Sequence, residues 1–348
     1  MDAGGGHHTV VVLLSPAGAV TVRTGPGRPA GGRAVARATT HRPRPGCAQY
    51  RWGVRRARPA APYRGTTIRP GWKAVRDGGP VGDRRKTVRS RMPVLPHHEI
   101  IGAPDAPPLI LASALGAAGR MWDPQRAALA ERFRVIVYDH RGHGRSPVPP
   151  GPYTLDDLGG DVLALLDHLG LSSVRFAGLS LGGMVGMWLA SHAPERVERL
   201  ALLCTSARLG TPEVWRERAE AVRRGGTAAV ADAVLERWFT PDLRRRSPET
   251  VAAVRETFLS TPAEGYAACC AAIETMDLTG DLASITAPTL VLAAKDDPST
   301  PVEPHAKTIA DGIAGARLVI VPDAAHLVNV ERPDVVTRHL LDHFLGES

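Results

Sequence analysis

Apolar runs and amphipathic helical patterns alternate along residues 92–348. The runs are short, rich in valine, leucine and isoleucine, and bounded by turn residues, which is typical of strands buried on both faces of a sheet. Between them, apolar residues recur three or four positions apart, as in helices that cover a sheet. This alternation predicts an α/β fold with a mostly parallel central sheet and helices on both faces. The predicted strands are residues 108–113, 133–139, 173–178, 197–204, 288–294 and 317–321.

The pattern changes between residues 209 and 278, where only helical spacing occurs. An insertion of this length between two strands is too long for a loop without structure of its own. We therefore predict a helical cap at 209–278 and a core at 92–208 and 279–348. Within the core, Thr154 and Asp157 have the spacing of a capping box that starts a helix. Further helices are predicted near 303–313 and at 333–345.

Residues 1–91 differ in composition from the rest of the chain. They contain 19 Lys or Arg and 3 Asp or Glu, a net charge of +16, whereas residues 92–348 have a net charge of −8. The segment is rich in Gly, Pro and Arg and has too few apolar positions to offset the entropy of ordering, so we predict that it is disordered. We interpret it as a stretch translated ahead of a natural start at Met92. A basic arm that binds nucleic acid is the alternative, which we do not favour.

The cysteines and the start of the chain bear on the cellular compartment. The first residues, Met-Asp-Ala-Gly-Gly-Gly-His-His, lack the basic region of a secretory signal, and the apolar run after them is too short to span a membrane. The four cysteines, Cys47, Cys204, Cys269 and Cys270, fit neither a disulfide framework nor a metal-binding spacing. A reduced, cytoplasmic compartment is the simplest interpretation, and we expect neither a membrane nor a nucleic acid as a partner.

The stretch from Val174 to Trp188 contains a Gly-x-Ser-x-Gly motif, Gly178-Leu-Ser180-Leu-Gly182. An apolar run ends at this motif and a helical pattern follows it, which predicts a strand, a sharp turn and a helix. The glycines remove Cβ atoms that would collide in so tight a turn. Ser180 would then lie at the apex, facing the N-terminus of the next helix.

Two further candidates each follow a predicted strand, where catalytic groups gather in open α/β sheets. The chain order Ser180, Asp297, His326 is that of the α/β-hydrolase fold. His326 would take the serine proton and return it to the leaving group, while Asp297 would orient and stabilise the imidazole. Asp296 is an alternative acid, because it lies one residue away. We favour Asp297 because a stiff Asp-Pro-Ser-Thr-Pro turn begins there.

Such a serine hydrolase also needs hydrogen-bond donors for the oxyanion of its intermediate. The candidates are the backbone N–H of Leu181, after the nucleophile, and that of Leu115, in the loop after the first long strand. His140 and His143 lie in the glycine-containing turn after the predicted strand 133–139, close to the catalytic edge of the sheet, and we expect at most a minor role for them. No His-Glu-x-x-His or Gly-x-Gly-x-x-Gly motif is present, so we expect no metal and no cofactor.

Several motifs together resemble those of the 3-oxoadipate enol-lactonases, over residues 96–346. The strand-end motifs occur in many α/β-hydrolases, whereas the cap motifs are more particular to the lactonases. The chain departs from the usual lactonase sequence at two places. It has Ser113-Ala-Leu-Gly116 where Asn-Ser-Leu-Gly is common and Ala294 where glycine is usual, and both changes leave the backbone donors in place. The motifs are Leu115-Gly116, Met121-Trp-Asp-Pro-Gln125, Tyr138-Asp-His-Arg-Gly-His-Gly-Arg-Ser146, Gly178-Leu-Ser-Leu-Gly-Gly183, Glu236-Arg-Trp-Phe-Thr-Pro241, Gly265-Tyr-Ala-Ala-Cys-Cys270, Ala272-Ile-x-x-Met-Asp277, Asp297-Pro-Ser-Thr-Pro301 and Ala325-His326-Leu.

The resemblance implies a serine hydrolase that opens 3-oxoadipate enol-lactone to 3-oxoadipate through an acyl-enzyme on Ser180, a step in the catabolism of protocatechuate and catechol. The small-molecule substrate is a five-membered enol-lactone with an acetate arm, whose carboxylate should find a cation near the cap. The candidate substrate contacts are Arg141, Arg216 and Arg237 as cations and Trp122, Trp215 and Trp238 as walls.

Other activities on this scaffold are kept as alternatives, because a cap can change while the catalytic groups stay. They are another serine esterase, a carbon–carbon bond hydrolase, and a ligand receptor of this fold. Dehalogenases and epoxide hydrolases would need a carboxylate in place of Ser180. We make no prediction of the oligomeric state.

Overall fold

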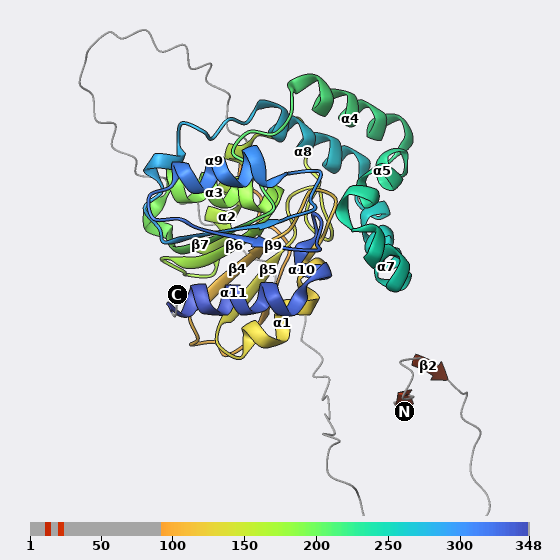
Figure 1. Ribbon diagram of the computed structural model, residues 1–348, viewed down its shortest axis with the longest axis horizontal. Helices are drawn as coiled ribbons and strands as arrows, with labels where there is room; N and C mark the ends of the chain where they lie inside the picture. The colour runs from red at the N-terminus through yellow and green to blue at the C-terminus, as the bar shows by residue number, and fades with distance from the viewer. Residues whose placement is uncertain (1–10, 15–19, 24–91, 347–348) are drawn as a thin grey trace, which may run out of the picture. The chain divides into compact units, whose positions relative to one another are not determined.

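The computed structural model describes residues 11–14, 20–23 and 92–346 of the chain, which divides into two units, Met1–Val81 and Gly82–Ser348 (Figure 1). In the first unit, strands β1 (Val11–Leu14) and β2 (Val20–Arg23) pair in antiparallel fashion. The other residues of the segment that we predicted to be disordered, and Cys47 with them, lie outside the described residues.

The second unit is built on a seven-stranded sheet with the order β3-β5-β4-β6-β7-β8-β9. All neighbouring strands pair in parallel except β3, which pairs antiparallel with β5 at one edge. The structure therefore confirms the predicted α/β class with a mostly parallel sheet. The strands are β3 (His98–Ile101), β4 (Pro108–Ala112), β5 (Arg134–Tyr138), β6 (Val174–Leu179), β7 (Val197–Leu203), β8 (Thr289–Ala294) and β9 (Arg317–Val321).

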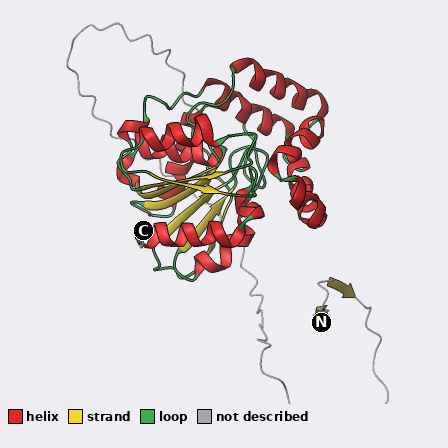
Figure 2. Ribbon diagram, in the orientation of Figure 1, coloured by secondary structure: helices red, strands yellow, loops and turns green. Residues whose placement is uncertain are grey.

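Helices cover both faces of this sheet (Figure 2). Helix α3 packs on β4, β6 and β7 with α2 beside it, and α9 packs on β9, while α1 and α11 cover the opposite face. Thr154 and Asp157 form the predicted capping box at the start of α2. The bounds are α1 (Asp123–Ala130), α2 (Leu155–His168), α3 (Leu181–His192), α9 (Lys307–Gly312), α10 (Val328–Glu331) and α11 (Pro333–Leu345), with short 3₁₀ or π turns η1 (Gly119–Trp122), η2 (Pro194–Arg196), η3 (Leu282–Ser284) and η4 (Val302–Ala306).

The cap consists of the five helices α4 to α8, which are inserted between β7 and β8 (Figure 1). Helix α4 packs along α8, and α5 packs against α4 and α7. Trp238, Phe258 and Tyr266 form a chain of edge-to-face ring contacts inside the cap, with successive ring centroids 5.5 Å apart. The helices are α4 (Pro212–Gly225), α5 (Ala228–Trp238), α6 (Pro241–Arg246), α7 (Pro248–Leu259) and α8 (Ala263–Thr275).

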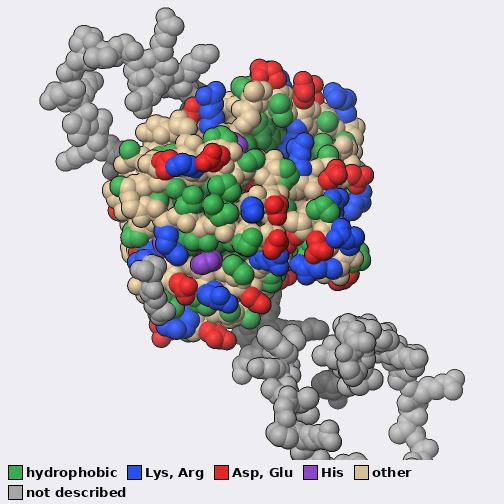
Figure 3. All heavy atoms as spheres, viewed as in Figure 1, with side chains coloured by type: hydrophobic (Ala, Val, Ile, Leu, Met, Phe, Trp, Pro, Cys, Tyr) green, Lys and Arg blue, Asp and Glu red, His purple; other side chains and the backbone are tan. Residues whose placement is uncertain are grey.

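Surface charge is mixed on the face that Figure 3 shows, where acidic and basic side chains lie interspersed, including over the cap helices. Within the described residues, the helices are too short or too polar to serve as membrane spans.

Candidate active site

Ser180 lies at the turn between β6 and α3, at the carboxyl end of a central strand. Its backbone has φ 57° and ψ −116°, a strained conformation for a residue with a side chain. The turn is tight enough that a Cβ on Gly178 would lie 2.2 Å from the Gly182 carbonyl oxygen, and one on Gly182 would lie 2.3 Å from that of Ala112. Helix α3 starts at Leu181, directly after the serine, and aims its N-terminus at it.

Asp297 and His326 meet beyond the ends of β8 and β9. The His326 Nδ1–H donates to Asp297 Oδ2 over 2.8 Å, which leaves Nε2 free to act as a base. Asp297 also accepts from the Thr300 hydroxyl at 2.6 Å and from the Ser299 N–H at 2.7 Å. Burial alone would raise the pKa of Asp297, but the facing imidazole and these hydrogen bonds outweigh it and lower that pKa. The carboxylate is thus held charged beside the histidine.

The rival acid, Asp296, takes a different position. Its backbone N–H donates to the Ala324 carbonyl oxygen, and its side chain lines a surface hollow with Thr240, Asp242 and Arg332. The geometry therefore distinguishes the two neighbours, since Asp297 is the one that accepts the hydrogen bond from His326.

Of the two predicted oxyanion donors, Leu181 directly follows Ser180 as the first residue of α3, and Leu115 lies in the loop after β4. The Gly182 N–H donates to the Ser113 carbonyl oxygen over 3.0 Å, which ties the start of α3 to the loop after β4. In that loop the Ala114 N–H points to Met121 Sδ and the Gly116 N–H to His143 Nε2. Among the residues that the structure describes, the N–H groups of Leu115 and Leu181 have no acceptor. Both are thus free to donate to an oxyanion.

His140 and His143 form hydrogen bonds with backbone groups of this loop. His140 Nε2 donates to the Ser113 carbonyl oxygen over 2.9 Å, and His143 Nε2 accepts from the Gly116 N–H over 2.9 Å. Burial lowers the pKa of His140 to about 3 and that of His143 to about 4, so both rings are uncharged near neutral pH. The two contacts, at Ser113 and Gly116, lie before and after Leu115 in the loop. These histidines therefore support the loop, which the sequence alone did not indicate. The sequence signal was the spacing of two histidines in a turn that follows the neighbouring strand.

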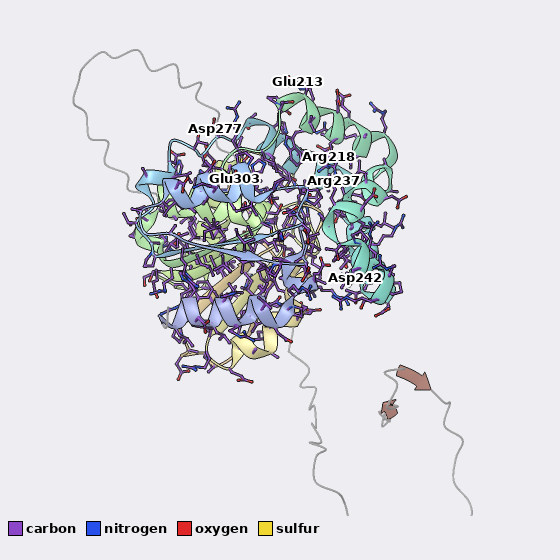
Figure 4. All side chains as sticks on the ribbon, viewed as in Figure 1. Glu213, Arg218, Arg237, Asp242, Asp277 and Glu303 are labelled. Atoms are coloured by element: carbon purple, nitrogen blue, oxygen red, sulfur yellow. The ribbon has the colours of Figure 1, made fainter. Side chains whose placement is uncertain are left out.

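Ser180 and His326 line one pocket between the core and the cap. Its wall carries two arginines, Arg218 and Arg237, and no acidic side chain. In the described part of the chain neither arginine is ion-paired, and Figure 4 shows both on the inner side of the cap, away from Glu213 and Asp242. The lining residues are Leu115, Ser180, Leu209, Trp215, Arg218, Val234, Arg237, Trp238, Tyr266, Ile273, Ser299 and His326.

Three of the six predicted substrate contacts line this pocket, namely Trp215, Arg237 and Trp238. Arg218 is a pocket cation that the sequence analysis missed. It lies three residues after Trp215 on α4, and its guanidinium is 5.0 Å from the Trp215 ring centroid. Residues three apart share a helix face, so the predicted wall residue Trp215 was the signal that could have identified it.

The other three lie elsewhere. Arg141 is fully buried and makes a bidentate contact with Asp161, with Nε 2.6 Å from Oδ2 and Nη2 2.5 Å from Oδ1. Arg216 is exposed on α4, where it pairs with Glu274 at 2.9 Å. Trp122 is fully buried in the core. Arg141 differs from the prediction because its sequence position beside the glycine turn did not reveal the buried carboxylate that binds it.

The described residues contain no cluster of three or more His, Cys, Asp or Glu side chains that could hold a metal ion. Cys204, Cys269 and Cys270 are buried free thiols.

Comparison with known proteins supports a hydrolytic site. The model of the alpha/beta hydrolase fold family matches residues 107–333. The protein named 3-oxoadipate enol-lactonase 2 of Acinetobacter baylyi is 40% identical over 243 residues, which cover 68% of this chain and 88% of that protein. A putative carbamate hydrolase of Stutzerimonas stutzeri, RutD, is 30% identical over 254 residues, which cover 71% of this chain and 96% of that protein.

A solved structure agrees with these sequence matches. The enol-lactonase from Burkholderia xenovorans LB400 superposes with a TM-score of 0.70 and is 44% identical, covering 72% of this chain and 96% of that one. The resemblance to enol-lactonases that the motifs indicated is confirmed by these relatives.

Proposed function

This chain belongs to the alpha/beta hydrolase fold family and is a hydrolase, and from that premise we propose that it opens 3-oxoadipate enol-lactone to 3-oxoadipate through an acyl-enzyme on Ser180. The observation that carries the substrate choice is the pair of unpaired cap arginines, Arg218 and Arg237, in the pocket of Ser180 and His326. A pocket with two guanidinium groups and no carboxylate favours an anionic substrate. The names of the relatives suggest which anion it is.

Acylation uses the core side of the pocket. Ser180 Oγ attacks the ring carbonyl carbon while His326 Nε2 takes the hydroxyl proton. The negative charge that develops on the carbonyl oxygen is met by the N–H groups of Leu115 and Leu181. Asp297 keeps the imidazole oriented and stabilises it while it is charged.

Ring opening then breaks the bond between the acyl carbon and the ring oxygen. The enol oxygen leaves with the proton from His326, and the enol becomes a ketone. A water molecule gives its proton to His326 and attacks the ester carbon, and Ser180 departs with that proton. The balance is one lactone anion and one water for one 3-oxoadipate dianion and one proton, which the new carboxyl group releases to solvent, with no redox change.

The cap side selects the substrate. The acetate carboxylate of the lactone would lie against Arg218 and Arg237, with Trp215 and Trp238 enclosing the ring. In this proposal the two predicted parts of the chain have different tasks. The core at 92–208 and 279–348 carries out the chemistry, and the cap at 209–278 recognises the substrate. The proposal includes the pathway that the resemblance implied, the breakdown of aromatic compounds.

The test is a steady-state ultraviolet assay that compares the enol-lactone with p-nitrophenyl acetate and a simple alkyl carbamate. We expect kcat/KM to be highest for the lactone, and Ser180→Ala to lower it at least ~10³-fold. Faster turnover of the neutral ester would favour a general esterase, and faster turnover of the carbamate would favour the activity named for the RutD relative. Unchanged lactone turnover by Ser180→Ala would refute the acyl-enzyme.

A further inference from the structure

Glu331 is a buried carboxylate close to the active site that the proposed reaction does not use. It ends helix α10, five residues after His326, and its side chain is 3% exposed. Its Oε2 accepts from the backbone N–H of Ala325 over 2.9 Å and, more weakly, from that of Thr240 over 3.4 Å. Its Oε1 accepts from the Thr240 hydroxyl. Glu331 thus bonds at once to the residue before His326 and to the cap.

A second bond joins the same two segments on the other side of the histidine. The Leu327 N–H donates to the Trp238 carbonyl oxygen over 3.0 Å. Both residues that flank His326 are therefore tethered to the segment 238–240, directly through Trp238 or through Glu331 and Thr240. This segment begins at Trp238, the last residue of α5, and continues the pocket wall formed by Arg237 and Trp238.

We propose that Glu331 is a positioning residue that locks the loop of His326 to the cap, so that the imidazole and the substrate-binding wall keep a fixed relation. An ionised carboxylate only accepts hydrogen bonds, and bonds to it are stronger than those between neutral groups. Without it, the buried Ala325 N–H would lack its acceptor, and the loop would shift to satisfy that group. The proposal rests on the proposed function in one respect, because it needs His326 to be the base.

A displacement of about 1 Å of a catalytic group can cost ~10²-fold in rate, so the lock would act mainly on kcat. A carboxylate that merely stabilises the fold would instead lower the melting temperature and leave the kcat of the folded enzyme unchanged. The two roles therefore differ in a measurable quantity.

The deciding variant is Thr240→Val, which keeps the buried carboxylate but removes the hydroxyl that donates to Glu331 and that also accepts from the Leu243 N–H at the start of α6. Its matched control is Thr227→Val at the other end of α5, which removes a single hydrogen bond to the Leu259 carbonyl oxygen within the cap. We expect Thr240→Val to lower kcat for the lactone ~10-fold with little change in KM. We expect Thr240→Ser, which retains the hydroxyl, to restore kcat, and Thr227→Val to leave it unchanged.

The variants of Glu331 itself test the size of the effect. Glu331→Gln keeps one oxygen acceptor, so its kcat should lie between those of the wild type and Glu331→Ala, for which we expect a loss of ~10²-fold. The rate at which diethyl p-nitrophenyl phosphate modifies Ser180 should fall in parallel, because that reaction needs the base but not the arginines. Melting temperatures identify any variant that fails to fold, and the threonine pair then decides.

Equal kcat values for Thr240→Val and Thr227→Val would overturn the lock. That outcome is separate from failure of the proposed function, which would appear as unchanged turnover by Ser180→Ala in the same assay. If Ser180→Ala is inactive and the threonine variants behave alike, the serine mechanism stands and Glu331 is a structural residue.

Discussion

The core side and the cap side of the pocket hold their charged groups in different ways. On the core side, Asp297 is met by His326, Thr300 and Ser299, so its hydrogen-bonding capacity is largely used within the protein. On the cap side, Arg218 and Arg237 have no carboxylate partner among the described residues. The core side is therefore organised before a substrate arrives, whereas the cap side leaves charge for the substrate to neutralise.

Arg141 shows the same contrast within one residue type. It lies on the core side, fully buried, with Asp161 as its bidentate partner and the Tyr153 ring 5.3 Å from its guanidinium carbon. Its charge is already compensated inside the fold. Substitution should therefore affect different quantities in the two cases. Replacing a cap arginine should weaken substrate binding, whereas replacing Arg141 should lower the stability of the fold.

The largest expected effect is that of Arg141→Met on stability. This change leaves Asp161 charged and unpaired in the interior, and breaking a buried ion pair in this way costs ~3–5 kcal/mol of unfolding free energy. Urea denaturation would measure the loss, and KM for the lactone should be unchanged in the protein that remains folded. A stable Arg141→Met variant with a raised KM would place this arginine on the binding side and break the comparison.

The next effect concerns the loop that carries Leu115. His143→Phe keeps an aromatic ring but removes the acceptor for the Gly116 N–H, so Leu115, the proposed oxyanion donor beside it, should lose its fixed position. We expect kcat for both the lactone and p-nitrophenyl acetate to fall ~10–100-fold. His343→Phe is a matched control, since His343 is also buried but lies on α11, outside the pocket lining. Equal kcat values for these two variants would show that the loop does not depend on His143.

A smaller and more selective effect is expected for the cap arginines. Arg237→Met and Arg218→Met should each raise KM for the lactone ~10-fold, because one charge-assisted hydrogen bond to the carboxylate is lost. The neutral ester p-nitrophenyl acetate provides the control, and its kcat/KM should stay within about twofold. Arg216 lies on α4, as Arg218 does, but it pairs with Glu274, so Arg216→Met should leave KM for both substrates unchanged. A loss on both substrates would mean that the arginines support the fold of the cap rather than the substrate.

The positions of Ser180, Asp297 and His326 on the core side were readable from the sequence, whereas the lining of the cap side was readable only in part. The strand-end positions of Ser180, Asp297 and His326 follow from apolar runs that end at turns, so local pattern and chain order are enough to bring them together. The core strands matched the predicted runs closely, and β9 and α11 matched them in full. The edge strand β3 was missed, because it pairs on one side only, and three of its residues are half-buried while Ile100 is exposed.

Which arginine faces the pocket depends instead on how α4 and α5 pack, which no local pattern reveals. Arg216 and Arg218 are two residues apart, yet the first pairs with Glu274 on the surface and the second lines the pocket. The burial of Arg141 against Asp161 likewise depends on contacts between residues 20 apart in the chain. Glu331 gave no signal, because its role comes from its distance to Thr240 in the cap.

The smallest expected effect is a dependence of stability on pH that comes from the core side. Burial lowers the pKa of His140 to about 3 and that of both His143 and His343 to about 4, whereas an unfolded chain has histidine pKa values near ~6.5. Between these limits the unfolded chain binds protons that the folded chain does not. These histidines therefore make no difference above pH ~6.5, and the unfolding free energy falls as the pH decreases from there towards ~4.

Urea denaturation at about pH 7, 6 and 5 would measure this slope. In His143→Phe the unfolded chain gains one proton fewer, so its unfolding free energy should fall less steeply, by at most ~1.4 kcal/mol per pH unit. The lowered pKa of Asp297 does not interfere, because that carboxylate takes up protons only at lower pH in either state. Identical slopes for the wild type and His143→Phe would mean that His143 of the folded protein takes up its proton over the same pH range as in the unfolded chain, and so carries a proton on both ring nitrogens below pH ~6.5. It could not then accept the Gly116 N–H, and the core side would be less firmly organised than its hydrogen bonds indicate.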